Sequence, residues 1–92
     1  MRNLTFTQQL IKEGDVIVAY CPELDVSSCG ATPEQARDNL RTAVRLFMEE
    51  AAKLGTLADI LVEAGYDLTR NVLTSPVFET SQGSLSIEGF AI

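Results

Sequence analysis

The chain has 92 residues, and 46% of them are hydrophobic, which is enough apolar material for one domain with a single core. Thirteen acidic residues against seven basic ones give a net charge of −6, which argues against direct binding to the phosphate backbone of nucleic acids. The sequence contains no apolar run long enough for a membrane span and no apolar signal core near its N-terminus, so we expect a cytoplasmic protein without membrane association.

The first third of the chain predicts a three-stranded antiparallel meander. Residues 3–12 begin with alternating apolar and polar side chains, and a turn signal at 13–15 leads into the strand VIVAYC at 16–21. That strand is apolar at nearly every position, which is typical of a central strand covered on both faces. Pro22 ends it, because proline lacks the N–H that a sheet ladder needs, and residues 26–31 form a third strand.

A long amphipathic helix follows the meander. Thr32 and Pro33 suit its N-cap and first position, and Gln35 completes a capping box. Apolar residues recur at helical spacing and predict one continuous stripe, made of Ala36, Leu40, Ala43, Val44, Phe47, Ala51 and Leu54. Gly55 then ends the helix in a left-handed conformation.

The rest of the chain predicts a short helix and C-terminal strands. The helix spans residues 57–64, and the signal is weak from 66 to 75. Residues 77–80 and 84–92 are expected to form a hairpin. This last segment either completes the sheet of its own chain or pairs with the edge of another protomer.

The whole pattern predicts one α+β domain over residues 1–92, in the order β-β-β-α-α-β(β). It consists of a three-stranded antiparallel β-meander, a long amphipathic helix, a short second helix and C-terminal strands. Residues 1–55 form the core of this domain and residues 56–92 an extension. Because so short a chain builds only a small core, we also expect a homo-oligomer, either a dimer or a tetramer.

Little in the sequence suggests catalysis. There is no histidine, and the spacing Cys-x7-Cys between Cys21 and Cys29 matches no zinc pattern. Both cysteines are expected to be reduced and to act as small buried hydrophobes. The glycines are dispersed among turns and caps rather than gathered in a phosphate-binding loop. We therefore expect no enzymatic activity, no cofactor and no metal.

Three groups of residues are candidates for contacting partners: carboxylates beside the central strand, arginines four residues apart on the helix, and apolar residues of the last segment. They are Asp15, Glu23 and Asp25; Arg37, Arg41 and Arg45; and Leu85, Ile87 and Phe90. The carboxylates suit a basic partner, and the arginines suit an anionic surface or a carboxylate-rich subunit. The alternatives are solvated acidic loops, arginines paired with Glu34, Asp38 and Glu49, and a last strand that pairs within its own chain.

The stretch GDVIVAYCPELDVSSCGATPEQARDNLRTAVRLFMEE resembles the HicB-like family, the antitoxin half of the HicA–HicB toxin–antitoxin pairs. The matching features are the turn Glu13-Gly14-Asp15, the strand end VAYCPEL at 18–24, the strand at 28–30, the cap TPEQA at 32–36, and Asn39, Leu40 and Ala43. The resemblance covers roughly residues 3–54. It implies a compact β-β-β-α-β domain, described as a partial RNase H-like fold.

The resemblance also implies a function. A HicB-like domain binds and masks a small basic HicA-type toxin, an mRNA interferase, and is commonly a homo-oligomer. Many members carry a C-terminal module that binds promoter DNA, but residues 56–92 contain only one basic residue, Arg70, so we expect no direct contact of this chain with nucleic acid.

Two alternatives to the antitoxin hypothesis stay open. One is a stand-alone homo-oligomeric adaptor built on the same fold, which the absence of a recognisable DNA-binding module favours. The other, more remote, is a metal-dependent RNase H-like nuclease. Such a nuclease needs several carboxylates that converge on paired metal ions, and the acidic residues nearest the central strand are Asp15, Glu23 and Asp25.

Overall fold

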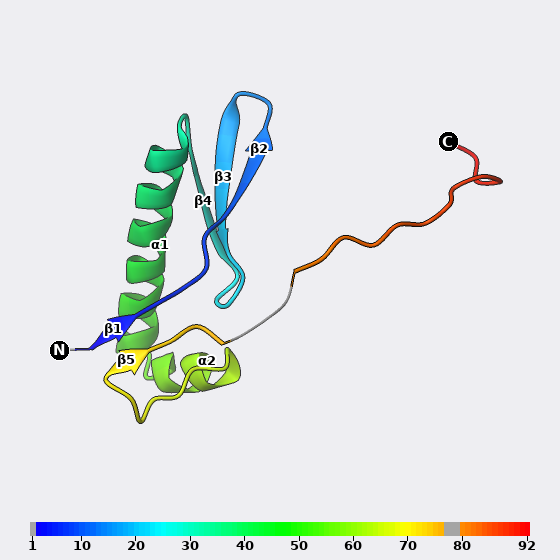
Figure 1. The fold of residues 1–92 in the computed structure, drawn as a ribbon. Coiled ribbons are helices and arrows are strands. Elements are labelled where there is room, and N and C mark those ends of the chain that lie inside the picture. The colour runs from blue at the N-terminus through cyan, green and yellow to red at the C-terminus, as the bar shows by residue number, and fades with distance from the viewer. Residues whose placement is uncertain (1, 77–79) are drawn as a thin grey trace.

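The structure, a computed structural model, describes residues 2–76 and 80–92. It confirms the α+β class: a long helix lies along a three-stranded sheet, and a short helix follows (Figure 1). A second, two-stranded sheet pairs residues near the N-terminus with residues that follow the short helix. The elements are β1 (Asn3–Leu4), β2 (Gln9–Glu13), β3 (Val16–Cys21), β4 (Val26–Gly30), α1 (Pro33–Lys53), α2 (Leu57–Glu63) and β5 (Val72–Leu73). Among the described residues, no helix has both the length and the apolar character to cross a membrane.

The predicted meander is present as the antiparallel sheet β2-β3-β4. Leu10 lies opposite Ala19, which in turn lies opposite Ser28, so β3 is the central strand as expected. Gly14 allows the tight turn between β2 and β3 because its φ is +59°, in the left-handed region that a Cβ disfavours.

The N-terminal strand differs from the prediction. Residues 3–12 do not form one strand: β1 pairs in parallel with β5, β2 pairs with β3, and residues 6–8 belong to neither pairing. The Thr5 N–H still donates to the Leu73 carbonyl at 2.8 Å. The alternation is interrupted near Gln8 and Gln9. Leu4 and Phe6 pack against the core rather than continuing the meander. The N-terminal segment therefore leaves the sheet and runs beside α1, as Figure 1 shows.

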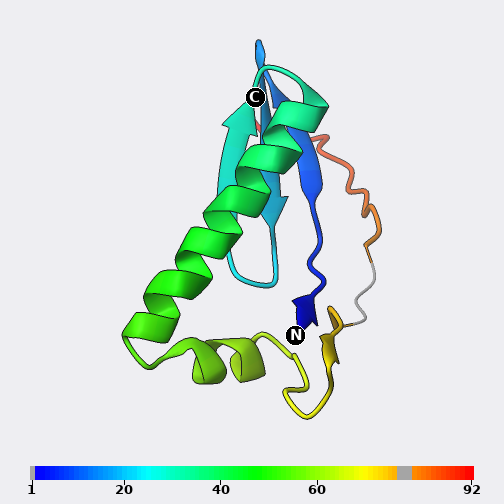
Figure 2. The same cartoon turned by 90° about the vertical axis from the view of Figure 1, so that its left-hand side faces the viewer.

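The strand β3 is covered on one face only. Ala19 and Cys21 are fully buried in the same core cluster as residues of α1, whereas Val16 is exposed and Val18 and Tyr20 are half-buried on the opposite face. Figure 2 shows α1 crossing the sheet on one side, with no helix on the other. The expectation that both faces of this strand are covered is therefore wrong within the described chain.

The start of α1 follows its predicted cap with one variation. The Thr32 hydroxyl accepts a hydrogen bond from the Gln35 N–H at 3.1 Å, as an N-cap should. The Gln35 side chain, however, accepts from the N–H of Ala31 at 2.8 Å rather than from that of Thr32. This second bond links the helix start to the residue that directly follows β4.

The apolar stripe of α1 contributes more buried residues to the core than any other helix or strand. Ala36, Leu40, Val44 and Ala51 are buried, and Phe47 packs beside them. Leu54 was expected to continue the stripe, but the helix ends at Lys53 and the Leu54 side chain is 69% exposed.

Both helices end in the same way. The N–H of Gly55 donates to Ala52 and that of Thr56 to Ala51, and Gly65 and Tyr66 repeat the pattern after α2. These paired bonds define a Schellman motif, with a left-handed glycine at each site. The second motif buries Tyr66 next to Leu61, and the Tyr66 hydroxyl donates to the Thr5 carbonyl at 2.6 Å. The N-terminal segment is thereby fixed to the end of α2.

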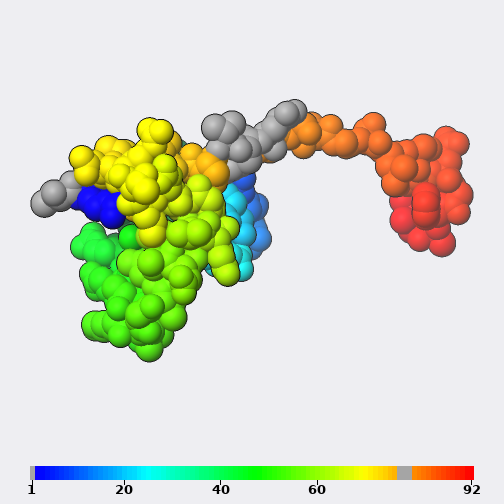
Figure 3. All heavy atoms as spheres, turned by 90° about the horizontal axis from the view of Figure 1, so that it is seen from below, coloured from blue at the N-terminus to red at the C-terminus, as the bar shows by residue number. Residues whose placement is uncertain are grey.

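The C-terminal strand occurs earlier in the chain than expected, at Val72–Leu73, where the sequence signal is weak. Residues 84–92 form no strand within this chain, so the expected hairpin is wrong for its second half, while residues 77–79 of its first half lie outside the described residues. We call residues 80–92 the C-terminal arm; it projects away from the remainder of the molecule (Figures 1 and 3).

Candidate binding surfaces

The carboxylate of Glu23 holds three segments together. It accepts hydrogen bonds from the Thr7 N–H at 2.8 Å, from the Thr7 hydroxyl at 2.8 Å and from the Ser75 hydroxyl. Partial burial favours a higher pKa for Glu23, but the bonds from Ser75, from its own backbone and from Thr7 outweigh it and lower the pKa. Its oxygens are satisfied inside the chain, so Glu23 positions the N-terminal segment; a partner contact through it stays a prediction.

The two cysteines differ in environment. Cys21 is fully buried beside Glu23, and its burial raises the pKa of the thiol to about 11, so the thiol is protonated at neutral pH. Cys29 is exposed on β4, opposite Val18. The expectation of a buried cysteine is therefore correct for Cys21 and wrong for Cys29.

We call the side of the sheet that faces away from α1 the outer sheet face. The register places on it Gln9, Ile11, Glu13, Val16, Val18, Tyr20, Ser27 and Cys29. Its centre is apolar, since Ile11, Val18 and Cys29 lie side by side on three strands. No lysine or arginine is among these residues: Lys12, the only basic residue of the sheet, lies opposite Ile17 and so belongs to the other face.

Carboxylates lie at both ends of the outer sheet face. Glu13 pairs with Val16 at one end. At the other end the Tyr20 hydroxyl donates to Asp25 at 2.8 Å, and this bond is the main cause that raises the pKa of Tyr20. Asp25 itself adopts a left-handed φ of 54° in the turn after β3. The outer sheet face therefore combines an apolar centre with a carboxylate at each end.

The three predicted carboxylates do not converge. Asp15 lies in the turn before β3 and Asp25 in the turn after it, and a six-residue strand spans about 20 Å. Glu23 lies near Asp25 in sequence but directs its oxygens toward Thr7 and Ser75. Within residues 2–76 and 80–92, no group of three or more potential ligand side chains is placed to hold a metal ion.

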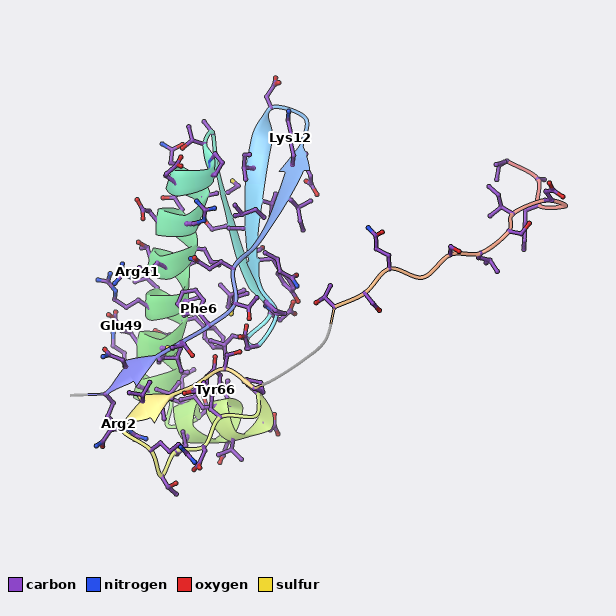
Figure 4. All side chains as sticks on the ribbon, in the orientation of Figure 1. Arg2, Phe6, Lys12, Arg41, Glu49 and Tyr66 are labelled. Carbon is purple, nitrogen blue, oxygen red and sulfur yellow. The ribbon has the colours of Figure 1, made fainter. Side chains whose placement is uncertain are left out.

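The three predicted arginines lie along one groove. We call it the arginine groove: the hollows between α1 and residues 2–8, lined by Arg37, Arg41, Arg45, Leu4, Phe6, Val44, Met48, Glu49 and Leu57, among others. The larger of its two hollows measures 530 Å³. Figure 4 shows Arg41 and Glu49 on α1 and Phe6 on the neighbouring segment. The groove joins an apolar floor to a wall that carries the three arginines, with the carboxylates Asp38 and Glu49 among its other lining residues.

The arginines of the groove are not paired as one alternative proposed. In the part of the chain that the structure describes, the single ion pair within 4.0 Å joins Arg70 to Asp67, so none of Arg37, Arg41 and Arg45 contacts Glu34, Asp38 or Glu49 at that distance. Arg2, at one end of the groove, is used differently. Its guanidinium donates to the carbonyls of Leu68 and Arg70, the second at 2.6 Å, and so fixes the N-terminus to the loop before β5.

The apolar residues of the C-terminal arm are open to solvent. Leu85, Ile87 and Phe90 are 80%, 54% and 63% exposed. The structure thus separates the nine predicted residues into an acidic group around the sheet, a basic group along α1 and an apolar group on the arm. Ile11, Val18 and Tyr20 were not predicted as surface residues. The strand β3 is apolar on both faces, so its sequence does not show which face α1 covers, and the alternation of β2 is interrupted before Ile11. The phenol of Tyr20 is the one signal of exposure in the sequence.

Comparison with protein-family models, curated proteins and solved structures finds no match to this chain.

Proposed function

We propose that this protein is a HicB-like antitoxin-type binding protein that acts in the cytoplasm by masking a small basic HicA-type toxin, with no chemistry of its own. The observation that supports it most is the outer sheet face, which combines an apolar centre with carboxylates at both ends. Such a surface attracts a basic partner electrostatically and gains affinity by burying Ile11, Val18 and Tyr20. The order of β2, β3, β4 and α1 also agrees with the fold that the resemblance implies.

The proposal is tested by co-expression of the chain with the product of a neighbouring gene for a small basic protein of HicA type, followed by co-purification and a toxicity assay. Glu13→Lys on the outer sheet face is expected to weaken binding about tenfold or more, because it places a like charge against the basic partner. Glu50→Lys is the matched control. It makes the same change of charge on an exposed position of α1, outside the outer sheet face.

Two results would contradict the antitoxin proposal. One is a wild-type protein that neither binds nor neutralises any HicA-type toxin. The other is equal loss of binding in Glu13→Lys and Glu50→Lys, which would mean that only net charge matters and not the outer sheet face.

A second candidate function is a stand-alone homo-oligomeric adaptor on the same fold. The exposed apolar side chains of the C-terminal arm favour it, because soluble chains seldom leave several such residues close together in solvent without a partner. Multi-angle light scattering tests it directly. A homo-oligomer supports this function, and a monomer at every concentration contradicts it.

A further inference from the structure

We propose that the C-terminal arm of one copy of this protein docks in the arginine groove of a second copy. The contact rests on the homo-oligomeric candidate function and states which surfaces join the copies. It is independent of toxin binding, because the arginine groove and the outer sheet face consist of different residues.

The end of the arm is a preformed turn rather than a straight strand. The Phe90 N–H donates to the Ile87 carbonyl at 3.1 Å, and Gly89 has a φ of +91°. This combination is a β-turn with glycine at the position that requires positive φ, and it brings the first and last residues of the turn within about 7 Å. The backbones of Ile87 and Phe90 therefore lie close together, with Glu88 and Gly89 at the tip of the turn between them. The turn interrupts the alternation, so it favours insertion into a hollow over a long sheet ladder.

The arginine groove is complementary to this turn. Its floor is apolar, formed by Leu4, Phe6 and Met48, and its main hollow of 530 Å³ falls within the range of about 300–1,000 Å³ typical of protein pockets. Arg41 lines both of the hollows that follow α1 and contacts no carboxylate within 4.0 Å in the described residues. The arm carries one acidic residue, Glu88, and no basic residue. The turn can thus bury Ile87 and Phe90 against the floor while Glu88 meets Arg41.

The direction of the arm favours a second copy over its own groove. In Figures 1 and 4 the arm lies on the side of the molecule opposite α1 and extends away from the body. Arg41 lies on α1, so the arm points away from the arginine groove of its own chain. If two copies exchange arms around a twofold axis, both contacts form at once, because each copy gives one arm and accepts the other. The proposed dimer is therefore closed and needs no further copies.

The first test measures the dimer dissociation constant of the full chain by sedimentation equilibrium. Phe90→Ser is expected to raise this constant at least about tenfold, because it removes an aromatic anchor from the contact. The matched control is Leu54→Ser, which removes another exposed apolar side chain from outside the groove and should leave the constant unchanged. The unfolding midpoint, measured in parallel on dilute protein, should stay the same in both variants because both side chains are exposed.

The second test exchanges the proposed charge pair. Arg41→Glu and Glu88→Arg should each weaken dimerisation several-fold, and the double variant should recover most of the loss, because the pair is then formed with reversed polarity. Glu88→Arg combined with Arg37→Glu serves as the control for charge alone. Equal recovery with either partner would overturn the assignment of the contact to Arg41.

The third test separates exchange between copies from docking within one chain. One sample is a Ser86→Cys variant in a Cys29→Ser background; it carries a spin label at position 86 and no ¹⁵N, and its buried Cys21 does not react with the label. It is mixed with a second sample, the ¹⁵N-labelled Cys29→Ser protein without a spin label. Exchange predicts broadening of the amide signals near Leu4, Phe6 and Arg41 of the isotope-labelled copy.

The remaining outcomes of these three tests each contradict a particular part of the proposal. Broadening seen only when the spin label and the isotope are on the same chain overturns the exchange, as does broadening confined to the outer sheet face. A dimer that is insensitive to Phe90→Ser overturns the arm contact and leaves the adaptor function standing. A monomer at every concentration overturns both.

Discussion

The two faces of β3 are both largely apolar in sequence, yet they have different environments in the structure. Ala19 and Cys21 on one face are small and fully buried, which allows α1 to approach the sheet closely. Val16, Val18 and Tyr20 on the other face are larger, yet the described chain places no helix over them. The covered face stabilises the fold, whereas the uncovered face is available to a partner. The comparison predicts that changes on the first alter stability and changes on the second alter binding.

The largest expected effect is on the covered face. Leu40 is fully buried between α1 and the sheet, and Leu40→Ala should lower the free energy of unfolding by about 2–5 kcal/mol. Ile11→Ala on the outer sheet face removes a side chain that is already 46% exposed and should cost less than about 1.5 kcal/mol. Denaturant unfolding measures both values. Equal losses would contradict the division between the two faces.

The next effect concerns the closeness of α1 and β4. A Cβ added at Gly30 would lie 2.6 Å from the backbone nitrogen of Ala36, so α1 or β4 must move to accept it. Gly30→Ala should cost about 1–3 kcal/mol, as overpacking typically does. Gly83→Ala is the control, because nothing lies within 4 Å of its added methyl group. A thermal shift in Gly30→Ala no larger than in Gly83→Ala would show that this contact is looser than described.

A smaller effect is expected from Glu23, which lies in the turn after β3 and binds Thr7 and Ser75. Because folding lowers its pKa below the ordinary value of 4.5, its contribution is fully present above that value and is lost as the pH falls through the lower folded-state pKa. Glu23→Gln should lower stability at neutral pH by about 1 kcal/mol through weakened bonds to Thr7 and Ser75. The difference from wild type should narrow in acid. A difference that is constant between neutral pH and strong acid would contradict this origin.

The smallest change is chemical and leaves stability unaltered. A thiol reagent should modify Cys29 on the outer sheet face of the native protein, while Cys21 reacts only after unfolding, because it is buried and its pKa is raised to about 11. Mass spectrometry counts the labels. Two labels on native protein would show that the covered face opens readily.

The features that depend on local chemistry were predictable. The Thr32 cap, the helix end at Gly55 and the turn at Gly14 each follow from one or two residues in sequence. What failed depends on contacts distant in sequence. The pairing of β1 with β5 joins residues about seventy positions apart, and nothing near Val72 indicates it. Alternation at Leu85 and Ile87 predicted a strand, but a strand needs a partner edge, and residues 2–76 and 80–92 supply none to them.

The candidate surfaces were predictable in part for the same reason. The arginines share one groove because helical spacing places them on one side of α1, which the sequence shows. The sequence shows which acidic residues lie beside the central strand, but it does not show that Glu13 and Asp25 lie at the two ends of one sheet face. The relation of these carboxylates to Ile11 and Val18 depends on the sheet register and on which face α1 covers.

The most direct test of the central claim is the map of amide chemical-shift changes when the ¹⁵N-labelled protein is titrated with a catalytically inactive HicA-type toxin. A partner on the outer sheet face predicts changes centred on Ile11, Val18 and Tyr20 and extending to Glu13 and Asp25. Changes confined to the arginine groove and the exposed side of α1, or no changes at all, would contradict the account.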